Sequence, residues 1–83
     1  MLQLRYFASL RDQLNCESEV LEWSDNLKTA VDVRAILISR GEQWATTISK
    51  PSVLIAINHE IGSNDSTISD GDEIAFFPPV TGG

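Results

Sequence analysis

The sequence predicts one α+β domain over residues 1–83, a mixed β-sheet with one main helix packed on one face. Three observations predict it: apolar and polar residues alternate at the start, a capped helical pattern occupies the middle, and a strand-like run ends in two prolines. The composition, 42% hydrophobic and 22% charged, is ordinary for a globular chain. A length of 83 residues leaves room for one small core.

The first two strands are expected near the N-terminal end. Leu2, Leu4 and Tyr6 alternate with other side chains, which is the period of two of a strand with one buried face. A short helical turn is expected over residues 10–14. A second strand is expected over residues 18–23, paired with the first in a hairpin.

The main helix is expected to begin at Thr29. Thr29 and Asp32 have capping-box spacing, so their side chains can bond free N–H groups of the first turn. Four residues at helical spacing form its expected buried face: Ala30, Val33, Ile36 and Leu37. Gly41 stands where a left-handed cap would end the helix. Trp44 follows in a short second turn, as a lid on the core.

The continuous apolar run over residues 53–57 predicts a central strand. A turn at 58–60 and a short return strand at 61–62 follow it.

A tight turn at residues 70–72 leads into the last strand, over 73–77. Pro78 and Pro79 end this strand because proline has no N–H to donate. The resulting order is strand, strand, helix, strand, short strand, strand. This is the element order of the ubiquitin-like β-grasp fold.

Charge and composition narrow the classes of partner. The net charge is −6 and the six basic residues are scattered singly, so we expect no nucleic-acid partner. The acidic balance fits steering toward a basic protein. No apolar run approaches the length of a membrane span, and no leader precedes the first strand, so we expect a soluble cytoplasmic protein with no membrane partner.

Most side chains that could carry chemistry are expected to be structural. Cys16 and His59 lie in different predicted loops, so a nucleophile–base pair is not expected. Asp70, Asp72 and Glu73 surround one glycine without the ligand spacing of a calcium loop, which indicates a hairpin turn. We expect no metal site and no cofactor bound to this chain.

The C-terminal segment is different. Residues 78–83 are expected to form an extended, flexible tail. Gly82 and Gly83 remove every side chain near the terminal carboxylate, so it could enter a channel too narrow for side chains. Taken alone, such an end is typical of a frayed terminus. When a Gly-Gly end directly follows the last strand of a β-grasp element order, however, it indicates a functional C-terminus.

An aromatic patch is expected beside the tail. If Ile74 and Phe76 point inward, Ala75 and Phe77 point outward, and Phe7 points the same way from the first strand. The first and last strands are neighbours in this fold, so the two phenylalanines would share one exposed surface. Such patches commonly bind partners, although a loop or the tail could cover this one.

These residues resemble a known family. Residues 70–83, Asp-Gly-Asp-Glu-Ile-Ala-Phe-Phe-Pro-Pro-Val-Thr-Gly-Gly, resemble the C-terminal signature of the molybdopterin synthase small subunits (MoaD). Residues 6–12 resemble the family's Phe-Phe-Ala-x-Leu-Arg-Glu motif, with Tyr and Asp substituted. Residues 56–58 resemble its Ala-Val-Asn segment. Residues 16–52 match only in pattern.

The resemblance implies a sulfur carrier. An adenylating enzyme related to ubiquitin activators would use ATP to activate the Gly83 carboxylate, and sulfur from a persulfide donor would convert it into a thiocarboxylate. That sulfur would go to cyclic pyranopterin monophosphate to form the dithiolene of molybdopterin. Acid–base groups and the substrate pocket would belong to the large synthase subunit, so the enzyme would be the assembled heterotetramer.

The resemblance also implies roles for other residues. Thr81 and Gly82 would line the insertion channel. The interface with the large subunit or the activating enzyme would include Phe7, Ala75, Phe77, Pro78, Pro79 and Val80.

Three alternatives remain open at the level of sequence. A carrier for thiamine or tRNA thiolation would share the Gly-Gly end. Conjugation to proteins through an isopeptide bond to Gly83 would need the same activation. A non-catalytic β-grasp interaction module would leave the Gly-Gly end unexplained.

Overall fold

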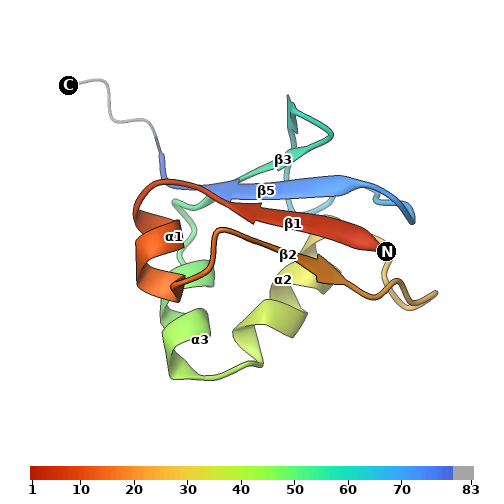
Figure 1. The fold of residues 1–83 in the computed structure, drawn as a ribbon. Helices are drawn as coiled ribbons and strands as arrows, with labels where there is room; N and C mark the ends of the chain where they lie inside the picture. Colours follow the sequence, from red (N-terminus) through yellow and green to blue (C-terminus); the bar gives the residue numbers. More distant parts are fainter. Residues whose placement is uncertain (80–83) are drawn as a thin grey trace.

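The computed structural model describes residues 1–79 (Figure 1). The expectations for Val80, Thr81, Gly82 and Gly83 lie outside the described residues. The element order is β1 (Leu2–Tyr6), α1 (Ser9–Leu14), β2 (Ser18–Leu21), α2 (Ala30–Ile38), α3 (Glu42–Ile48), β3 (Leu54–Ile57), β4 (Glu60–Ile61) and β5 (Glu73–Phe77).

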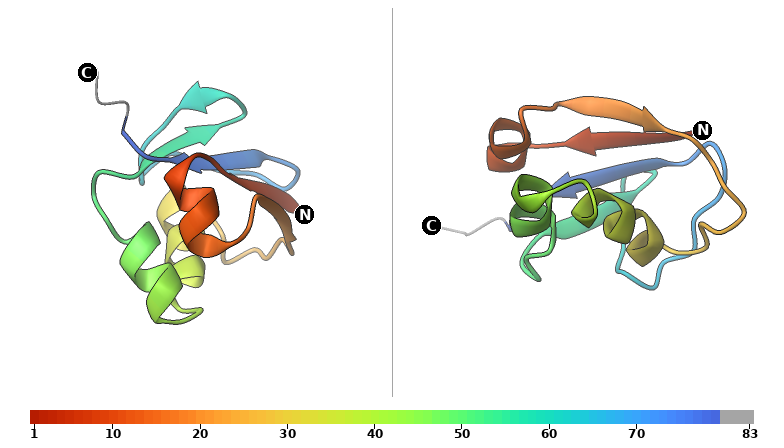
Figure 2. Two further views of the ribbon diagram at one scale, coloured as in Figure 1. Left: turned by 60° about the vertical axis from the view of Figure 1, so that its left-hand side comes forward. Right: turned by 90° about the horizontal axis from the view of Figure 1, so that it is seen from below.

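The strands form one mixed sheet in the order β2-β1-β5-β3-β4. The last strand, β5, lies at its centre, parallel to β1 and antiparallel to β3. The helices lie on one side of this sheet (Figures 1 and 2). This arrangement confirms the predicted α+β, β-grasp fold, although the helical layer is divided among three short helices. None of the helices in residues 1–79 is long and apolar enough to cross a membrane.

The core lies between the sheet and the helices. Leu2, Leu4 and Tyr6 of β1 are buried, and so are Ile74 and Phe76 of β5. The residues between them are exposed or half-buried, so both strands alternate as predicted. One face of the sheet is therefore the floor of the core and the other faces outward.

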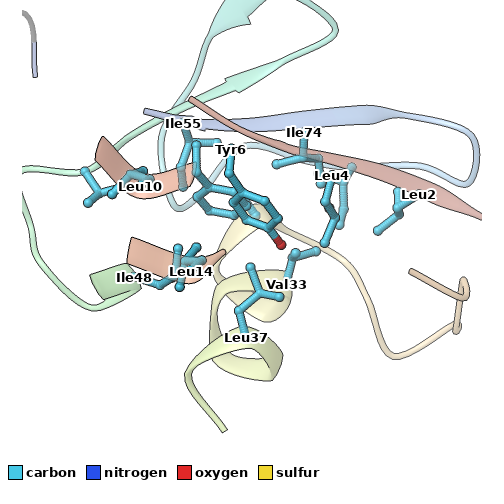
Figure 3. Close-up of a cluster of buried hydrophobic side chains, with 14 of the residues drawn as sticks. Leu2, Leu4, Tyr6, Leu10, Leu14, Val33, Leu37, Ile48, Ile55 and Ile74 are labelled. Atoms are coloured by element: carbon cyan, nitrogen blue, oxygen red, sulfur yellow. The ribbon is translucent and has the colours of Figure 1, made fainter. Parts of the chain in front are cut away.

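Tyr6 lies in the middle of this core. Its ring stacks at 5.9 Å from the ring of Phe76 and meets the edge of Trp44 at 5.5 Å. Figure 3 shows it between the sheet and the side chains of Val33 and Leu37 on α2. Trp44 is half-buried on α3, which confirms its predicted place over the core.

The start of α2 agrees with the predicted capping pattern. The Asp32 carboxylate accepts hydrogen bonds from the N–H groups of Lys28, at 2.8 Å, and Thr29, at 3.0 Å. One carboxylate thus satisfies two N–H groups at the helix start.

The expected buried face of α2 was wrong at one position. Ile36 is 36% exposed, and Arg34 is buried in the core-facing stripe instead.

The prediction for Gly41 was wrong. The residue that caps α2 is Ser39, in a right-handed helical conformation. Gly41 instead precedes α3 as its N-cap, at φ +140°. The glycine therefore begins a helix, because its freedom at positive φ allows the sharp entry into α3.

Three strand predictions need adjustment at their ends: β3 begins at Leu54 instead of residue 53, β4 spans Glu60–Ile61 instead of 61–62, and β2 is shorter than predicted. β2 stops at Leu21, and Trp23 lies beyond it, half-buried against the core. β1 and β2 pair antiparallel as predicted, and the helical turn expected between them at residues 10–14 is α1, which begins one residue earlier. The return strand β4 follows a turn in which Asn58 and His59 have φ of 51° and 71°.

Candidate functional site

The end of β5 is the described part of the predicted site. Gly83, with Thr81 and Gly82, lies outside the described residues, whereas Phe77, Pro78 and Pro79 lie within them. Phe77 and Pro78 are half-buried and Pro79 is exposed. The structure therefore describes the surface from which the last residues of the chain continue.

That surface is the outer side of the sheet. Phe77 of β5 is the register partner of Leu54 on β3. On the other side, the N–H of Phe7 donates a 3.1 Å hydrogen bond to the carbonyl oxygen of Phe76, which continues the parallel ladder by one residue. Phe7, Phe77 and Leu54 thus form one apolar row across three strands.

A second row runs beside the first. Ala75 of β5 pairs with Ala56 of β3, and Ala56 pairs with Ile61 of β4. Ile61 is 71% exposed, Phe7 43% and Leu54 37%. We call the two rows together the apolar face: Phe7, Leu54, Ala56, Ile61, Ala75 and Phe77. Ala56 is buried and Ala75 and Phe77 are half-buried, while Phe7, Leu54 and Ile61 are exposed, and a group of exposed apolar side chains is typical of a binding surface.

The alternation of the first and last strands predicted Phe7, Ala75 and Phe77 on this face, but it did not predict Leu54, Ala56 or Ile61. A continuous apolar run such as β3 is usual for a strand covered on both sides. Here the helices cover only one side, so Leu54 is left facing outward. The unbroken apolar run was therefore a signal of the surface, because its second face requires a partner.

Beneath the sheet, one carboxylate connects three elements. Glu19 of β2 accepts hydrogen bonds from the Tyr6 hydroxyl, at 2.8 Å, and from two nitrogens of Arg40, at 2.7 Å each. The bonds from Arg40 hold the pKa of Glu19 below its ordinary value, although burial opposes them. Burial, with the neighbouring Glu19, raises the pKa of the Tyr6 hydroxyl. This network fixes β1 and β2 against the connection between α2 and α3.

Cys16 and His59 have contacts with different residues. The Cys16 thiol is half-buried, 3.9 Å from a carboxylate oxygen of Glu19, and burial raises its pKa. A raised pKa disfavours the reactive thiolate. The His59 ring is largely exposed, with Nε2 3.3 Å from a carboxylate oxygen of Glu73. Within residues 1–79, Cys16 and His59 therefore do not form a nucleophile–base pair.

The acidic turn before β5 has structural contacts. Asp72 accepts hydrogen bonds from the N–H of Ser69, at 2.7 Å, and from the side-chain amide of Asn58, at 3.0 Å. Gly71 has φ +95°, which glycine adopts without strain. Within residues 1–79 no group of three or more His, Cys, Asp and Glu side chains could hold a metal ion. The turn positions the start of β5.

Sequence comparison relates the chain to sulfur carriers. The ThiS family profile matches residues 4–83. The molybdopterin synthase sulfur carrier subunit of Haemophilus influenzae is 42% identical over 83 residues, covering 100% of both chains. The protein of the same name from Escherichia coli is 32% identical, again over 100% of both chains.

Solved structures share the fold. A putative molybdopterin converting factor, subunit 1, from Pyrococcus furiosus has a TM-score of 0.77 at 25% identity, over 95% of this chain and 97% of that one. A complex of subunits 1 and 2 of the molybdopterin-converting factor from Helicobacter pylori contains a chain with a TM-score of 0.68 at 24% identity, over 99% of this chain and 97% of that one.

Proposed function

The chain belongs to the ThiS family, and on that premise we propose that it is the sulfur carrier subunit of a molybdopterin synthase. The observation that carries the proposal is the 42% identity to a carrier of that name along the full length of both chains. The matched residues 4–83 include the Gly-Gly end to which the sulfur chemistry is assigned.

The chemistry proposed for Gly83 needs activation because a carboxylate is a poor acylating group. An adenylating enzyme joins AMP from ATP to the Gly83 carboxylate and releases pyrophosphate. The terminal sulfur of a persulfide donor then displaces AMP, and a thiol reduces the S–S bond of the resulting acyl disulfide, which leaves Gly83 as a thiocarboxylate and the thiol in a disulfide. The polarisable sulfur of the thiocarboxylate forms a C–S bond to cyclic pyranopterin monophosphate in the large subunit, which supplies the acid–base groups. Water then cleaves the resulting thioester, so the sulfur stays on the pterin and Gly83 returns to a carboxylate. This chain supplies the sulfur and the docking surface.

The geometry of the described residues supports this role. The apolar face lies at the end of β5, at Phe77, directly before the proline pair. Six residues follow Phe77, and six residues can span at most about 20 Å. A partner that binds the Gly83 end must therefore hold its reactive pocket within about that distance of the apolar face. A single docking surface can thus serve both the large subunit and the adenylating enzyme in turn.

The first experiment tests the loading of Gly83. We expect intact mass spectrometry of the chain, co-expressed with its adenylating enzyme and sulfur donor, to show replacement of one oxygen by sulfur at Gly83. A variant lacking Gly83 is the control and should fold normally without gaining this sulfur. Sulfur on another residue, or loading of the shortened variant, would contradict the proposal.

The second experiment identifies the product. The loaded carrier is mixed with the large subunit and cyclic pyranopterin monophosphate, and labelled sulfur is followed. We expect the label in molybdopterin. Label recovered in the thiazole of thiamine or in thiolated tRNA from cells would assign the carrier to a different pathway. Lysine adducts of Gly83 as the main cellular form would assign it to protein conjugation.

A further inference from the structure

A hollow lies on the outer side of the sheet, between β1 and β2. Its volume is about 210 Å³ and it is lined by Gln3, Leu4, Arg5, Ser18, Glu19 and Val20. Gln3 pairs with Val20 and Arg5 pairs with Ser18, so these two pairs share one side of the sheet. It is the side opposite the buried Leu4. We call this feature the Arg5 hollow.

The Arg5 hollow adjoins the apolar face. The guanidinium carbon of Arg5 lies 5.8 Å from the centre of the Phe7 ring. In the parallel ladder, Arg5 is also the register partner of Ala75. Both neighbours belong to the apolar face, so a protein that covers Phe7 and Ala75 must also cover Arg5.

Arg5 makes no ion pair within residues 1–79. The two carboxylates of the adjacent strands have other partners. Glu19 accepts from Arg40 on the core side of the sheet, and Glu73 lies 3.3 Å from His59. A cation on an exposed surface has water as its partner and needs no carboxylate. The same cation buried at an interface without an anion is strongly destabilising.

The chemistry of the Arg5 hollow selects an acidic side chain. A guanidinium presents paired N–H donors that match the two oxygens of a carboxylate. The Gln3 amide and the Ser18 hydroxyl add neutral donors to the same lining. We propose that the Arg5 hollow is a specificity site that receives an Asp or Glu side chain of the large subunit docked on the apolar face. This inference rests on the function proposed above.

Such a site adds discrimination to an interface that is otherwise apolar. Contacts between apolar surfaces are not specific for one partner. A buried charge adds specificity, because binding is weakened for any partner that has no opposite charge at that position. The whole chain has a net charge of −6, which attracts basic surfaces. Arg5, by contrast, requires an acidic group at one point of the partner's surface. A correct partner must be compatible with an acidic carrier and still place a carboxylate opposite Arg5.

The binding test compares two charge reversals. Lys28, an exposed residue in the connection before α2, provides the matched control, because Lys28→Glu changes the net charge as much as Arg5→Glu does. We expect Arg5→Glu to weaken binding of the full-length chain to the large subunit by about 10- to 100-fold, and Lys28→Glu by about 2-fold or less. Calorimetric titration gives the affinities, and thermal unfolding checks that both variants are folded.

The acidic partner residue is identified with a neutral variant. Each Asp and Glu on the docking side of the large subunit is changed to its amide and titrated against the wild type and Arg5→Leu. One position should weaken binding to the wild type but cause no further loss with Arg5→Leu.

Two results would overturn the inference while leaving the carrier function intact: equal effects of Arg5→Glu and Lys28→Glu, or the absence of any coupled acid. Absence of binding by the wild-type chain would remove the proposed function and this inference together.

Discussion

The Nε atom of Arg34 donates a 2.8 Å hydrogen bond to the carbonyl oxygen of Ile48, the last residue of α3. The other guanidinium nitrogens donate to the carbonyl oxygen of Lys50, at 2.7 Å, and to the side-chain oxygen of Asn64, at 2.9 Å. Burial lowers the pKa of this arginine. Arg34 thus joins α2 to the segments on both sides of the β3–β4 ribbon, which carries Leu54 and Ile61 of the apolar face.

Replacement of Arg34 should destabilise the fold. We expect Arg34→Met to lower the free energy of unfolding by about 2–4 kcal/mol, because Met keeps the apolar stem but leaves buried acceptors without donors. Denaturant titration followed by circular dichroism measures the change. Arg11→Met, at an exposed position of α1, is the control and should change stability by less than about 0.5 kcal/mol. Equal stability of the two variants would contradict the structural role of Arg34.

The Glu19 network should give a pH-dependent contribution to stability. Arg40, followed by Tyr6, holds the pKa of Glu19 below its ordinary 4.5. A group with a lowered pKa in the folded state stabilises the fold above its ordinary pKa, and this stabilisation is lost as the pH falls through the folded-state pKa. We therefore expect Glu19→Gln to cost about 1–2 kcal/mol at pH 7, and to cost progressively less as the pH falls below about 4.5.

The measurement is the free energy of unfolding of both proteins from pH 7 to pH 3. Glu17→Gln, at an exposed neighbouring position, is the control. Its difference from the wild type should stay within about 0.5 kcal/mol at pH 7. A Glu19→Gln penalty that stays constant down to pH 3 would show that the carboxylate charge makes no contribution.

The backbone at Ala8 should be strained. Ala8 has φ 54° and ψ −130°, a region that side chains with Cβ rarely occupy, between Phe7 of the apolar face and the start of α1. We expect Ala8→Gly to raise the free energy of unfolding by about 0.5–1 kcal/mol, because relief of strain exceeds the added entropy of the unfolded chain. Ala35→Gly, within α2, should lower it by about 1 kcal/mol. A destabilised Ala8→Gly variant in the same thermal or denaturant assay would rule out strain at this residue.

Alanine substitutions at two neighbouring residues of β5 should affect different properties: Phe76→Ala the stability of the fold, and Phe77→Ala the binding of the large subunit. Phe76 is buried at 0% exposure, and Phe77 points to the outer side. We expect Phe76→Ala to lower the free energy of unfolding by about 3–5 kcal/mol. Phe77→Ala should cost about 1 kcal/mol or less in folding but weaken binding of the large subunit by 10-fold or more, about 1.4 kcal/mol. A large loss of stability in Phe77→Ala with unchanged binding would place Phe77 in the core.

The strands were predictable because alternation and turn residues are local signals. The range of β5, 73–77, agrees with its expected bounds, since a glycine turn precedes it and a proline pair follows. The register that brings Phe7 beside Phe77 followed from the neighbouring first and last strands of a β-grasp sheet. The bounds of β5 depend on backbone periodicity and proline chemistry, which are visible in a short window of sequence, whereas its pairing with β1 was predicted from the fold as a whole.

The errors concern choices that tertiary contacts decide. Ile36 fits the apolar stripe of α2 by spacing, yet Arg34 is buried because carbonyl groups of a distant segment accept its hydrogen bonds. A glycine such as Gly41 can end one helix or begin the next, and the residue type does not distinguish the two. The position of α3 makes Gly41 its N-cap. The unbroken apolar run of β3 indicates that both of its faces are apolar, but the side that the helices cover, and hence the exposure of Leu54, is decided by tertiary packing.

The central position of β5 also constrains how the chain is synthesised. Its residues 73–77 are translated after every other strand, and both β1 and β3 pair with it. Until these residues leave the ribosome, no segment of the nascent chain can pair with both β1 and β3, so the edge of β1 that faces β5 has no partner strand. Completion of the sheet therefore waits for β5, the last of its strands to be translated. A partner can therefore recognise the complete apolar face only after the last strand of the carrier has been translated.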